Sequence, residues 1–260
     1  MKKKFIHDML VLENKILSDK YFLLSLQPPI AMPEIAAGQF AQLEINDSKN
    51  TFLRRPISIH DVDYKNNIVK LLVQVVGEGT KKLSKIKAGE TLNLVYPLGN
   101  TFSLPKHDKD SVLLVGGGCG IAPLLYLART LSEKGIKVTT LVGGATQCDI
   151  LEAAEYRKYG ELLITTMDAS VGEKGLVTQH SIFKTEKFNY SKIYTCGPEP
   201  MMKALAIIAR EKGIDCEVSL ENMMACGVGA CLCCVVDTID GNKCTCTEGP
   251  VFDYKEIKGW

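Results

Sequence analysis

The chain concentrates six of its ten cysteines between positions 226 and 246 of its 260 residues. The part that holds them, roughly 40 residues from position 221 onward, is too short to be stabilised by an apolar core of its own. A secreted disulfide framework is typically a short chain with cysteines spread along it, which is not the pattern here. The concentration therefore predicts that bound metal holds this segment together. The six residues are Cys226, Cys231, Cys233, Cys234, Cys244 and Cys246.

The spacing of these cysteines narrows the kind of metal centre. Cys226, Cys231 and Cys234 follow the C-x4-C-x2-C pattern of plant-type iron–sulfur proteins, and Cys246 stands further on as a fourth ligand. The loop between the first two cysteines is rich in glycine, which lets backbone amides turn toward sulfur atoms. We predict a [2Fe–2S] cluster on these four residues.

The cysteine pattern leaves alternatives open. A structural zinc site is one, although zinc sites usually take two close C-x2-C-type pairs, and disulfides or free thiols are another. Cys244 could also replace Cys246 as the fourth ligand. We favour Cys246 because it directly precedes the turn at 247–250.

The first hundred residues carry a strand pattern. Short apolar or alternating runs are separated by glycine and proline, which predicts a small antiparallel barrel. The expected strands lie at Tyr21–Gln27, 40–45, 57–59, 68–76 and 91–96, with a short helix at 81–86.

After a polar linker at 106–110, strand and helix patterns alternate, which predicts a doubly wound parallel sheet with helices on both faces. The expected strands are 112–115, 138–142, 162–165, 193–195 and 216–220, and the expected helices are 122–131, 150–159 and 200–212. We therefore divide the chain into an antiparallel barrel domain (1–105), an α/β domain (106–220) and a small cysteine-rich domain (221–260).

Two glycine-containing turns in the α/β domain indicate a nucleotide site. Gly117, Gly118 and Gly120 join a buried strand to a helix, and Cys196-Gly197 does the same later in the chain. Glycines let the backbone approach a pyrophosphate, and both turns belong at the carboxyl edge of the sheet, where ligands bind. A tight strand–helix turn without a ligand is the alternative. In the nucleotide interpretation Cys196 lies near the nicotinamide.

The barrel carries its own candidate phosphate contacts. The run from Arg54 to Ser58 offers a guanidinium for a pyrophosphate and a hydroxyl for a ring heteroatom. Gly79 and Thr80 open the expected helix, where free amides offer a second phosphate site. Surface arginines and an ordinary capping turn are the alternatives.

Charge and hydropathy exclude other classes of protein. Lys plus Arg is 31 and Asp plus Glu is 30, so the net charge of +1 favours neither nucleic acid nor an anionic membrane. No apolar run reaches the roughly 18 residues that a membrane helix needs. A soluble, cytoplasmic chain is the expectation.

Together, these motifs resemble the ferredoxin–NADP reductase-like flavoproteins, and among them the electron-transfer subunits of dihydroorotate dehydrogenase B. The resemblance spans nearly the whole chain. It rests on residues 53–59 (LRRPISI), 96–100 (YPLGN), 116–123 (GGGCGIAP), 194–197 (YTCG) and the cysteine motif from Met224 to Phe252. Two positions depart from the pattern of the relatives: Ala169 stands where a glycine is frequent, and Cys119 occupies a variable position in the glycine loop.

The resemblance implies FAD in the barrel, NAD(H) on the α/β domain and the [2Fe–2S] cluster on the four cysteines. The implied flavin residues are Arg55, Pro56, Ile57 and Ser58 lining the ring, Leu72, Val73 and Gln74 along it, and Gly79 and Thr80 at its phosphates. It implies no catalytic side chain. A separate FMN-containing catalytic subunit would oxidise dihydroorotate, and electrons would pass through the cluster and FAD to NAD+ in the synthesis of UMP, in a heterotetramer of two plus two subunits.

Rival functions fit parts of the same pattern. The small subunit of an NADH-dependent ferredoxin:NADP oxidoreductase, or of a hydrogenase or sulfide dehydrogenase diaphorase, shares the cysteine pattern. A zinc-stapled binding module without redox activity is the rival from another class. NAD is favoured over NADP because no basic cluster follows the strand near 141–147, where a 2′-phosphate would need arginine.

Overall fold

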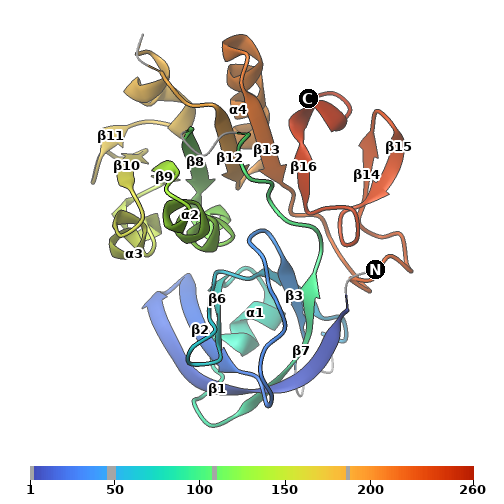
Figure 1. The fold of residues 1–260 in the computed structure, drawn as a ribbon. Coiled ribbons are helices and arrows are strands. Elements are labelled where there is room, and N and C mark those ends of the chain that lie inside the picture. The colour runs from blue at the N-terminus through green and yellow to red at the C-terminus, as the bar shows by residue number, and fades with distance from the viewer. Residues whose placement is uncertain (1–2, 46–50, 107–109, 186–187) are drawn as a thin grey trace.

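The computed structural model describes residues 3–45, 51–106, 110–185 and 188–260 and arranges them in two seven-stranded sheets and a separate hairpin (Figure 1). Asn46 and Asp47, directly after the expected strand at 40–45, and residues 107–109 of the expected linker lie outside the described residues. The two sheets follow one another along the chain, and the C-terminal segment contacts both.

The first sheet is antiparallel and bends into a half-barrel, which confirms the predicted barrel. Its strands run in the order β4-β3-β7-β1-β2-β6-β5. They are β1 (Phe5–Ser18), β2 (Tyr21–Gln27), β3 (Phe40–Leu43), β4 (Arg55–Ser58), β5 (Asp61–Asp63), β6 (Ile68–Gln74) and β7 (Thr91–Leu98), and helix α1 (Glu78–Leu83) follows β6. The inner faces bury side chains such as Phe22, Leu24 and Leu71.

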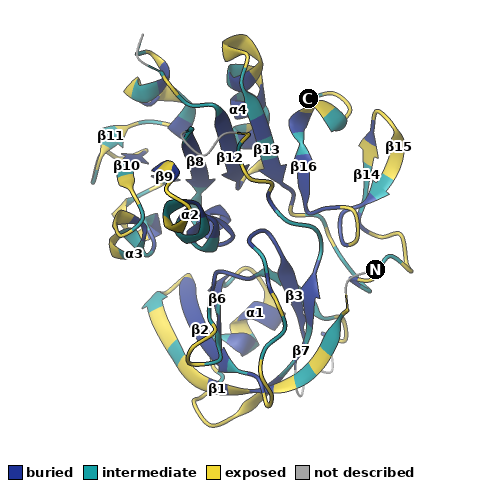
Figure 2. Ribbon diagram, viewed as in Figure 1, coloured by how far each residue is buried: buried dark blue, intermediate teal, exposed yellow. Residues whose placement is uncertain are grey.

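Strand β1 is missing from the sequence prediction. It spans 14 residues and pairs with both β2 and β7. Only Met9 and Val11 are fully buried along it, while charged residues share its exposed positions, so its apolar pattern is weak. Figure 2 shows the resulting mixture of buried and exposed residues along β1.

The second sheet confirms the doubly wound prediction. Its order is β11-β10-β9-β8-β12-β13-β16, with every pair parallel except β13 and β16. Helices α2 and α3 cover one face and α4 the other. The elements are β8 (Ser111–Gly117), α2 (Leu124–Glu133), β9 (Lys137–Gly144), α3 (Ala153–Arg157), β10 (Glu161–Thr166), β11 (Glu173–Lys174), β12 (Lys192–Cys196), α4 (Glu199–Lys212), β13 (Asp215–Ser219) and β16 (Val251–Asp253).

Short 3₁₀ helices connect these elements. They are η1 (Gly118–Ile121), η2 (Gln147–Asp149), η3 (Val177–Gln179), η4 (Ser181–Phe183) and η5 (Tyr254–Glu256). Helix α3 is shorter than the expected 150–159 because Glu152 takes a left-handed conformation, with φ of 49°, directly before it. Helix α4 ends at Gly213 in the left-handed region, as a glycine C-cap predicts.

The C-terminal segment is divided between the two sheets. Strands β14 (Val235–Thr238) and β15 (Gly241–Cys244) form a hairpin, while β16 joins the second sheet beside β13. Phe40 and Leu98 of the first sheet pack against Cys234, Cys244 and Cys246. The cysteine segment is thus held against the barrel, although part of it belongs to the α/β sheet.

Helix α2 fixes the α/β domain to the barrel (Figure 1). Arg129 on α2 forms an ion pair with Asp61 at 2.9 Å, and His60 Nδ1 donates to the Ala122 carbonyl at 2.8 Å. Burial lowers the pKa of His60 to about 4, so its ring is neutral and its Nδ1 carries the proton. This contact places the glycine loop that precedes α2 over the barrel.

No helix in the described ranges is long and apolar enough to span a membrane.

Candidate functional site

A cavity of about 570 Å³ lies between the barrel and the segment that follows β13. Most of the residues predicted to contact the flavin line it. They are Arg55, Pro56, Ile57, Ser58, Leu72, Gln74 and Thr80. Strand β4 therefore supplies one wall, and alternate residues of β6 supply another, because successive side chains of a strand point to opposite faces.

Two predicted residues contribute differently. The Val73 side chain is directed into the barrel core, so any contact with a flavin would run through its backbone. Gly79 lies behind the cavity wall, where a Cβ atom would come 2.9 Å from Arg55 Nε. The absence of a Cβ there leaves room for the Arg55 guanidinium beside the start of α1.

The two neighbouring arginines have different roles. Arg54 donates hydrogen bonds to the carbonyls of Gln42 and Asn93 and pairs with Glu44 at 2.7 Å. Arg55 Nη1 donates to the Leu53 carbonyl at 2.8 Å and to no carboxylate among the described contacts. Arg54 thus stabilises the barrel, whereas Arg55 keeps its charge available to an anion in the cavity.

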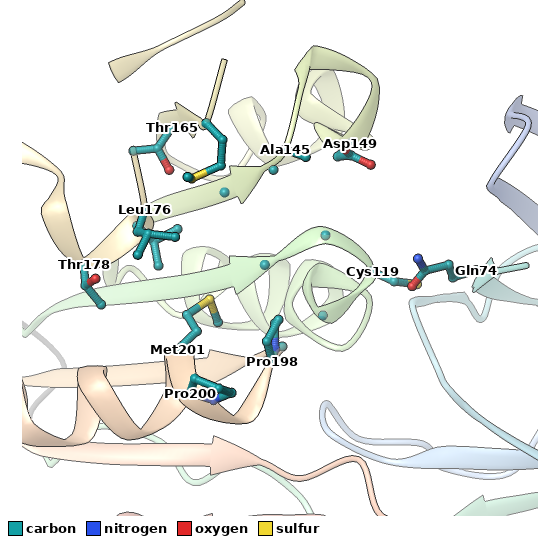
Figure 3. Close-up of a pocket in the computed structure, with 18 of the residues that line it drawn as sticks. Gln74, Cys119, Ala145, Asp149, Thr165, Leu176, Thr178, Pro198, Pro200 and Met201 are labelled. Atoms are coloured by element: carbon teal, nitrogen blue, oxygen red, sulfur yellow. The ribbon is translucent and has the colours of Figure 1, made fainter. Parts of the chain in front are cut away.

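A second cavity of about 670 Å³ lies at the carboxyl edge of the parallel sheet (Figure 3). The predicted Gly117, Gly118, Gly120 and Gly197 line it. The Thr165 hydroxyl lines it too and has no hydrogen-bond partner among the described residues. In Figure 3, Thr165 and Leu176 lie on one side and Pro198 and Met201 on another, with Gln74 reaching in from the barrel. A bare glycine edge with an unpaired buried hydroxyl fits a dinucleotide.

The two predicted turns meet in space. A Cβ atom on Gly120 would lie 2.4 Å from both the Cys196 carbonyl oxygen and Gly197 Cα. The Cys196 side chain is fully buried and does not line the cavity, and burial raises its pKa well above the ordinary value. Cys196 therefore supports the turn as a neutral thiol, with its Sγ 3.7 Å from a carboxylate oxygen of Glu221.

Gln74, Cys119 and Glu221 line both cavities, so the two spaces adjoin. Neighbouring protein atoms desolvate the Glu221 carboxyl, although the residue as a whole is exposed, and this raises its pKa; burial together with Glu221 raises the pKa of Cys119 to about 12. Sequence reasoning missed Glu221, although its position directly after a parallel strand was a usable signal.

Sequence reasoning also missed the contact between the Tyr21 hydroxyl and Asp149. The hydroxyl donates to Asp149 Oδ1 at 3.1 Å across the two domains, beside the second cavity. Tyr21 and Asp149 are 128 positions apart in the sequence, and no sequence pattern indicates that they meet.

The glycine loop directs backbone amides at sulfur. Cys226 Sγ accepts hydrogen bonds from the amides of Val228, Ala230 and Cys231 at 3.3–3.4 Å. Burial acts to raise the pKa of Cys226, but these amides outweigh it and bring the pKa to about 6. The loop thus stabilises a thiolate, which is the form that binds iron.

The four predicted ligands lie two by two. Cys226 contacts Cys231, and Cys234 contacts Cys246, whose amide donates to Cys234 Sγ at 3.4 Å. Within the described ranges, no three Cys, His, Asp or Glu side chains converge as a single metal ion requires. The contacts of Cys226 with Cys231 and of Cys234 with Cys246 fit a two-iron cluster held by four thiolates.

The fourth position favours Cys246 over Cys244. Cys246 Sγ accepts the amide of Gly229 at 3.2 Å, which ties it to the glycine loop. Cys244 also contacts Cys234, but its thiol accepts no loop amide among the described hydrogen bonds. Cys233 is exposed and lines the first cavity (the flavin cavity, after the group that it is predicted to hold), so the cysteine segment reaches this cavity.

The unusual Ala169 occupies a left-handed conformation, with φ of 62°. It follows Asp168, whose carboxylate holds the turn by accepting from the Ser170 amide and hydroxyl. The left-handed conformation costs a residue with a Cβ roughly 1–2 kcal/mol relative to glycine. Part of this difference is offset because glycine loses more conformational entropy on folding. We expect Ala169→Gly to raise the free energy of unfolding by about 0.5–1 kcal/mol in denaturant titrations. A decrease would show that another contact fixes this turn.

Comparisons with known proteins agree with this geometry. Residues 221–258 match the iron–sulfur cluster binding domain of dihydroorotate dehydrogenase B, and residues 114–206 match the oxidoreductase NAD-binding domain. The dihydroorotate dehydrogenase B (NAD(+)) electron transfer subunit of Fusobacterium nucleatum is 37% identical over 97% of this chain and 98% of the relative. That of Clostridium acetobutylicum is 39% identical over 99% and 98%.

A solved structure extends the likeness to three dimensions. A chain of the NADH-dependent reduced ferredoxin–NADP oxidoreductase superposes with a TM-score of 0.87 and 31% identity, over 96% of this chain and 89% of that chain. The ferredoxin reductase of carbazole 1,9a-dioxygenase, at 19% identity, a TM-score of 0.68 and coverage of 82% and 67%, shares the fold.

Proposed function

Because this chain belongs to the dihydroorotate dehydrogenase B (NAD(+)) electron transfer subunits, we propose that it is the NAD-reducing component of an oxidoreductase complex in pyrimidine biosynthesis. One observation carries the proposal: the flavin cavity lies between the other two sites. It adjoins the second cavity, proposed to hold NAD(H), through Gln74, Cys119 and Glu221. On its other side it is lined by Cys233 of the cysteine segment. The order of the sites is therefore the order that electron transfer requires.

Separate sets of residues would bind NAD(H), FAD and the iron–sulfur cluster. Nicotinamide exchanges a hydride, an iron–sulfur cluster exchanges single electrons, and a flavin placed between them can do both. Arg55 would pair with the FAD pyrophosphate, and the amides of the glycine loop would hold that of NAD(H). Gln74, Cys119 and Glu221, which line both cavities, would lie where the two rings meet. Cys226, Cys231, Cys234 and Cys246 would hold the cluster.

The surface near the cysteines suits a partner subunit. An electron-transfer subunit works with a catalytic subunit, which we propose to contain FMN and to join in a two-plus-two complex. Leu232, between two of the cysteines, is 64% exposed, and Met223, at the mouth of the flavin cavity, is 85% exposed. These apolar side chains lie where such a subunit would approach the cluster.

A second candidate function is a subunit of an NADH-dependent ferredoxin–NADP oxidoreductase. It is favoured by the 31% identity to a chain of that complex over 96% of the present chain. The two candidates share the cofactors and differ in the partner, so the protein that copurifies with the native chain separates them.

Anaerobic titration of the native complex tests the proposal. We expect NADH to bleach a flavin absorption band and to produce the EPR signal of a reduced binuclear cluster. Dihydroorotate should reduce the same centres in the complex but not in the isolated chain. A colourless protein, or a flavoprotein in which no cluster signal follows full reduction, would overturn the electron-transfer function.

Replacing Arg55 by alanine should weaken FAD binding without unfolding the barrel. A hydrogen bond to a charged group contributes roughly 1.5–3 kcal/mol, so we expect the FAD dissociation constant to rise about 10- to 100-fold. Fluorescence titration of the deflavinated protein measures it. Arg54→Ala is the matched comparison: Arg54 also lines the cavity, but its guanidinium is bonded to Gln42, Asn93 and Glu44 of the barrel, so its loss should lower stability more than flavin affinity. Equal flavin affinity in Arg55→Ala and the wild type would remove Arg55 from the site.

A further inference from the structure

The side chain of Gln42 is buried without a partner. Gln42 is 0% exposed, and neither its Nε2 nor its Oε1 has a hydrogen bond among the described residues. Leaving a buried amide unpaired costs roughly 1–3 kcal/mol for each group, so such residues are uncommon unless a ligand completes them. Exchanging the two amide atoms would not remove the problem, since both lack partners.

The position of Gln42 identifies what the amide faces. On β3, Ala41 and Leu43 point into the barrel core, so Phe40 and Gln42 face the opposite side. That side is covered by the cysteine segment, with Phe40 packed in the cluster that contains Cys234 and Cys246. The first sheet therefore presents the polar side chain of Gln42 to the cysteine segment.

Gln42 touches the glycine loop at the residue after the first cysteine. A Cβ atom on Gly227 would lie 2.8 Å from Gln42 Cγ and 2.9 Å from Nε2, so only glycine leaves room for this amide. Gly227 has a φ of 68° and links Cys226 to the amides that bind its sulfur. The Gln42 amide thus lies against the same loop, and it comes from a different domain.

We propose that Gln42 donates a hydrogen bond from Nε2 to a sulfur of the [2Fe–2S] cluster on the Cys226 side and so sets the cluster's reduction potential. The inference rests on the proposed function. Donors to cluster sulfurs stabilise the added negative charge of the reduced state and raise the potential. Gln42 is a positioning and tuning residue of the barrel that acts on the cluster, without being an iron ligand.

Three variants test the donor. Gln42→Met keeps nearly the same volume and removes the N–H groups, while Gln42→His restores an N–H the same number of bonds from the backbone. Gln39→Met is the control, because Gln39 is equally buried but its amide is bonded to Ala36 and Gly99. The measurement is the cluster midpoint potential from EPR-monitored titration of protein with a full content of iron and sulfide, with the FAD potential as an internal reference.

We expect the ratio of reduced to oxidised cluster at a fixed potential to fall about tenfold in Gln42→Met, which is about 59 mV for one electron. Gln42→His should recover most of the shift, and Gln39→Met and the FAD potential should not move. An unchanged cluster potential in fully loaded Gln42→Met would overturn the inference.

A second measurement decides the matter if Gln42→Met cannot retain iron. In wild-type protein carrying ¹⁵N only in glutamine side chains, pulsed EPR of the reduced cluster should show a ¹⁵N coupling, and its absence would overturn the inference. A wild-type protein that yields no cluster signal at all would instead contradict the proposed function. The failures of the two proposals are thus distinguishable.

Discussion

Replacing Cys234 by serine is expected to remove the iron and inorganic sulfide from the protein and to leave FAD bound. Cys234 is 2% exposed and packs with Cys246 against Phe40 and Leu98, so its thiol is fixed in place, and we expect the neighbouring Cys244 not to substitute for it as a ligand. The predicted flavin contacts belong to β4, β6 and α1, and although Phe40 of this packing also lines the cavity, Cys234 does not. Iron and acid-labile sulfide per FAD should fall from a full cluster to near zero, and NADH should still bleach the flavin.

Cys233→Ser is the matched control for that result. Cys233 is the adjacent residue, but it is exposed and faces the flavin cavity, so its loss should leave iron and sulfide unchanged. Cys244→Ser then settles the fourth ligand, since we expect it to retain iron while Cys246→Ser does not. Full iron in Cys234→Ser, or loss of iron in Cys233→Ser, would contradict the ligand assignment.

The sequence patterns that predicted the fold correctly are local ones. The apolar runs of β2, β6 and β8 specify buried strands by themselves, and glycine turns followed by apolar helices specify the carboxyl edge of a parallel sheet. The C-x4-C-x2-C spacing is equally local, because one loop presents three of the thiols. These features do not depend on what the rest of the chain packs against.

The missed features depend on contacts between distant segments. Gln42 reads as an ordinary polar residue of an alternating strand, and only the cysteine segment folding over β3 makes it buried and unpaired. Tyr21 and Asp149 meet only when the two domains dock. Strand β16 has three residues and is stabilised by pairing with β13, so its own sequence carries little signal. No pattern within one segment encodes such pairings.

Introducing a single methyl group at Gly120 should slow the reduction of the flavin by NADH while leaving FAD and the cluster bound. The added Cβ would lie 2.4 Å from the Cys196 carbonyl oxygen and from Gly197 Cα, and both are backbone atoms that cannot rotate away. The two turns that form the dinucleotide site must therefore move apart. We expect the rate of flavin reduction by NADH to fall at least about 100-fold in Gly120→Ala, equivalent to about 2.7 kcal/mol of activation free energy.

Gly117→Ala provides the graded comparison, because both glycines line the same cavity. Its added Cβ would meet Met201 Sδ at 2.9 Å, a contact that the methionine side chain can rotate to relieve, and Pro198 Cδ at 3.1 Å, where a shift of a few tenths of an ångström suffices. We expect a loss of less than about tenfold there, so the two variants distinguish backbone collision from mere narrowing of the cavity. Stopped-flow reduction by NADH measures both, and dithionite should still reduce FAD and cluster fully in each. Wild-type rates in Gly120→Ala would mean that contact between the two turns is not what builds the NAD site.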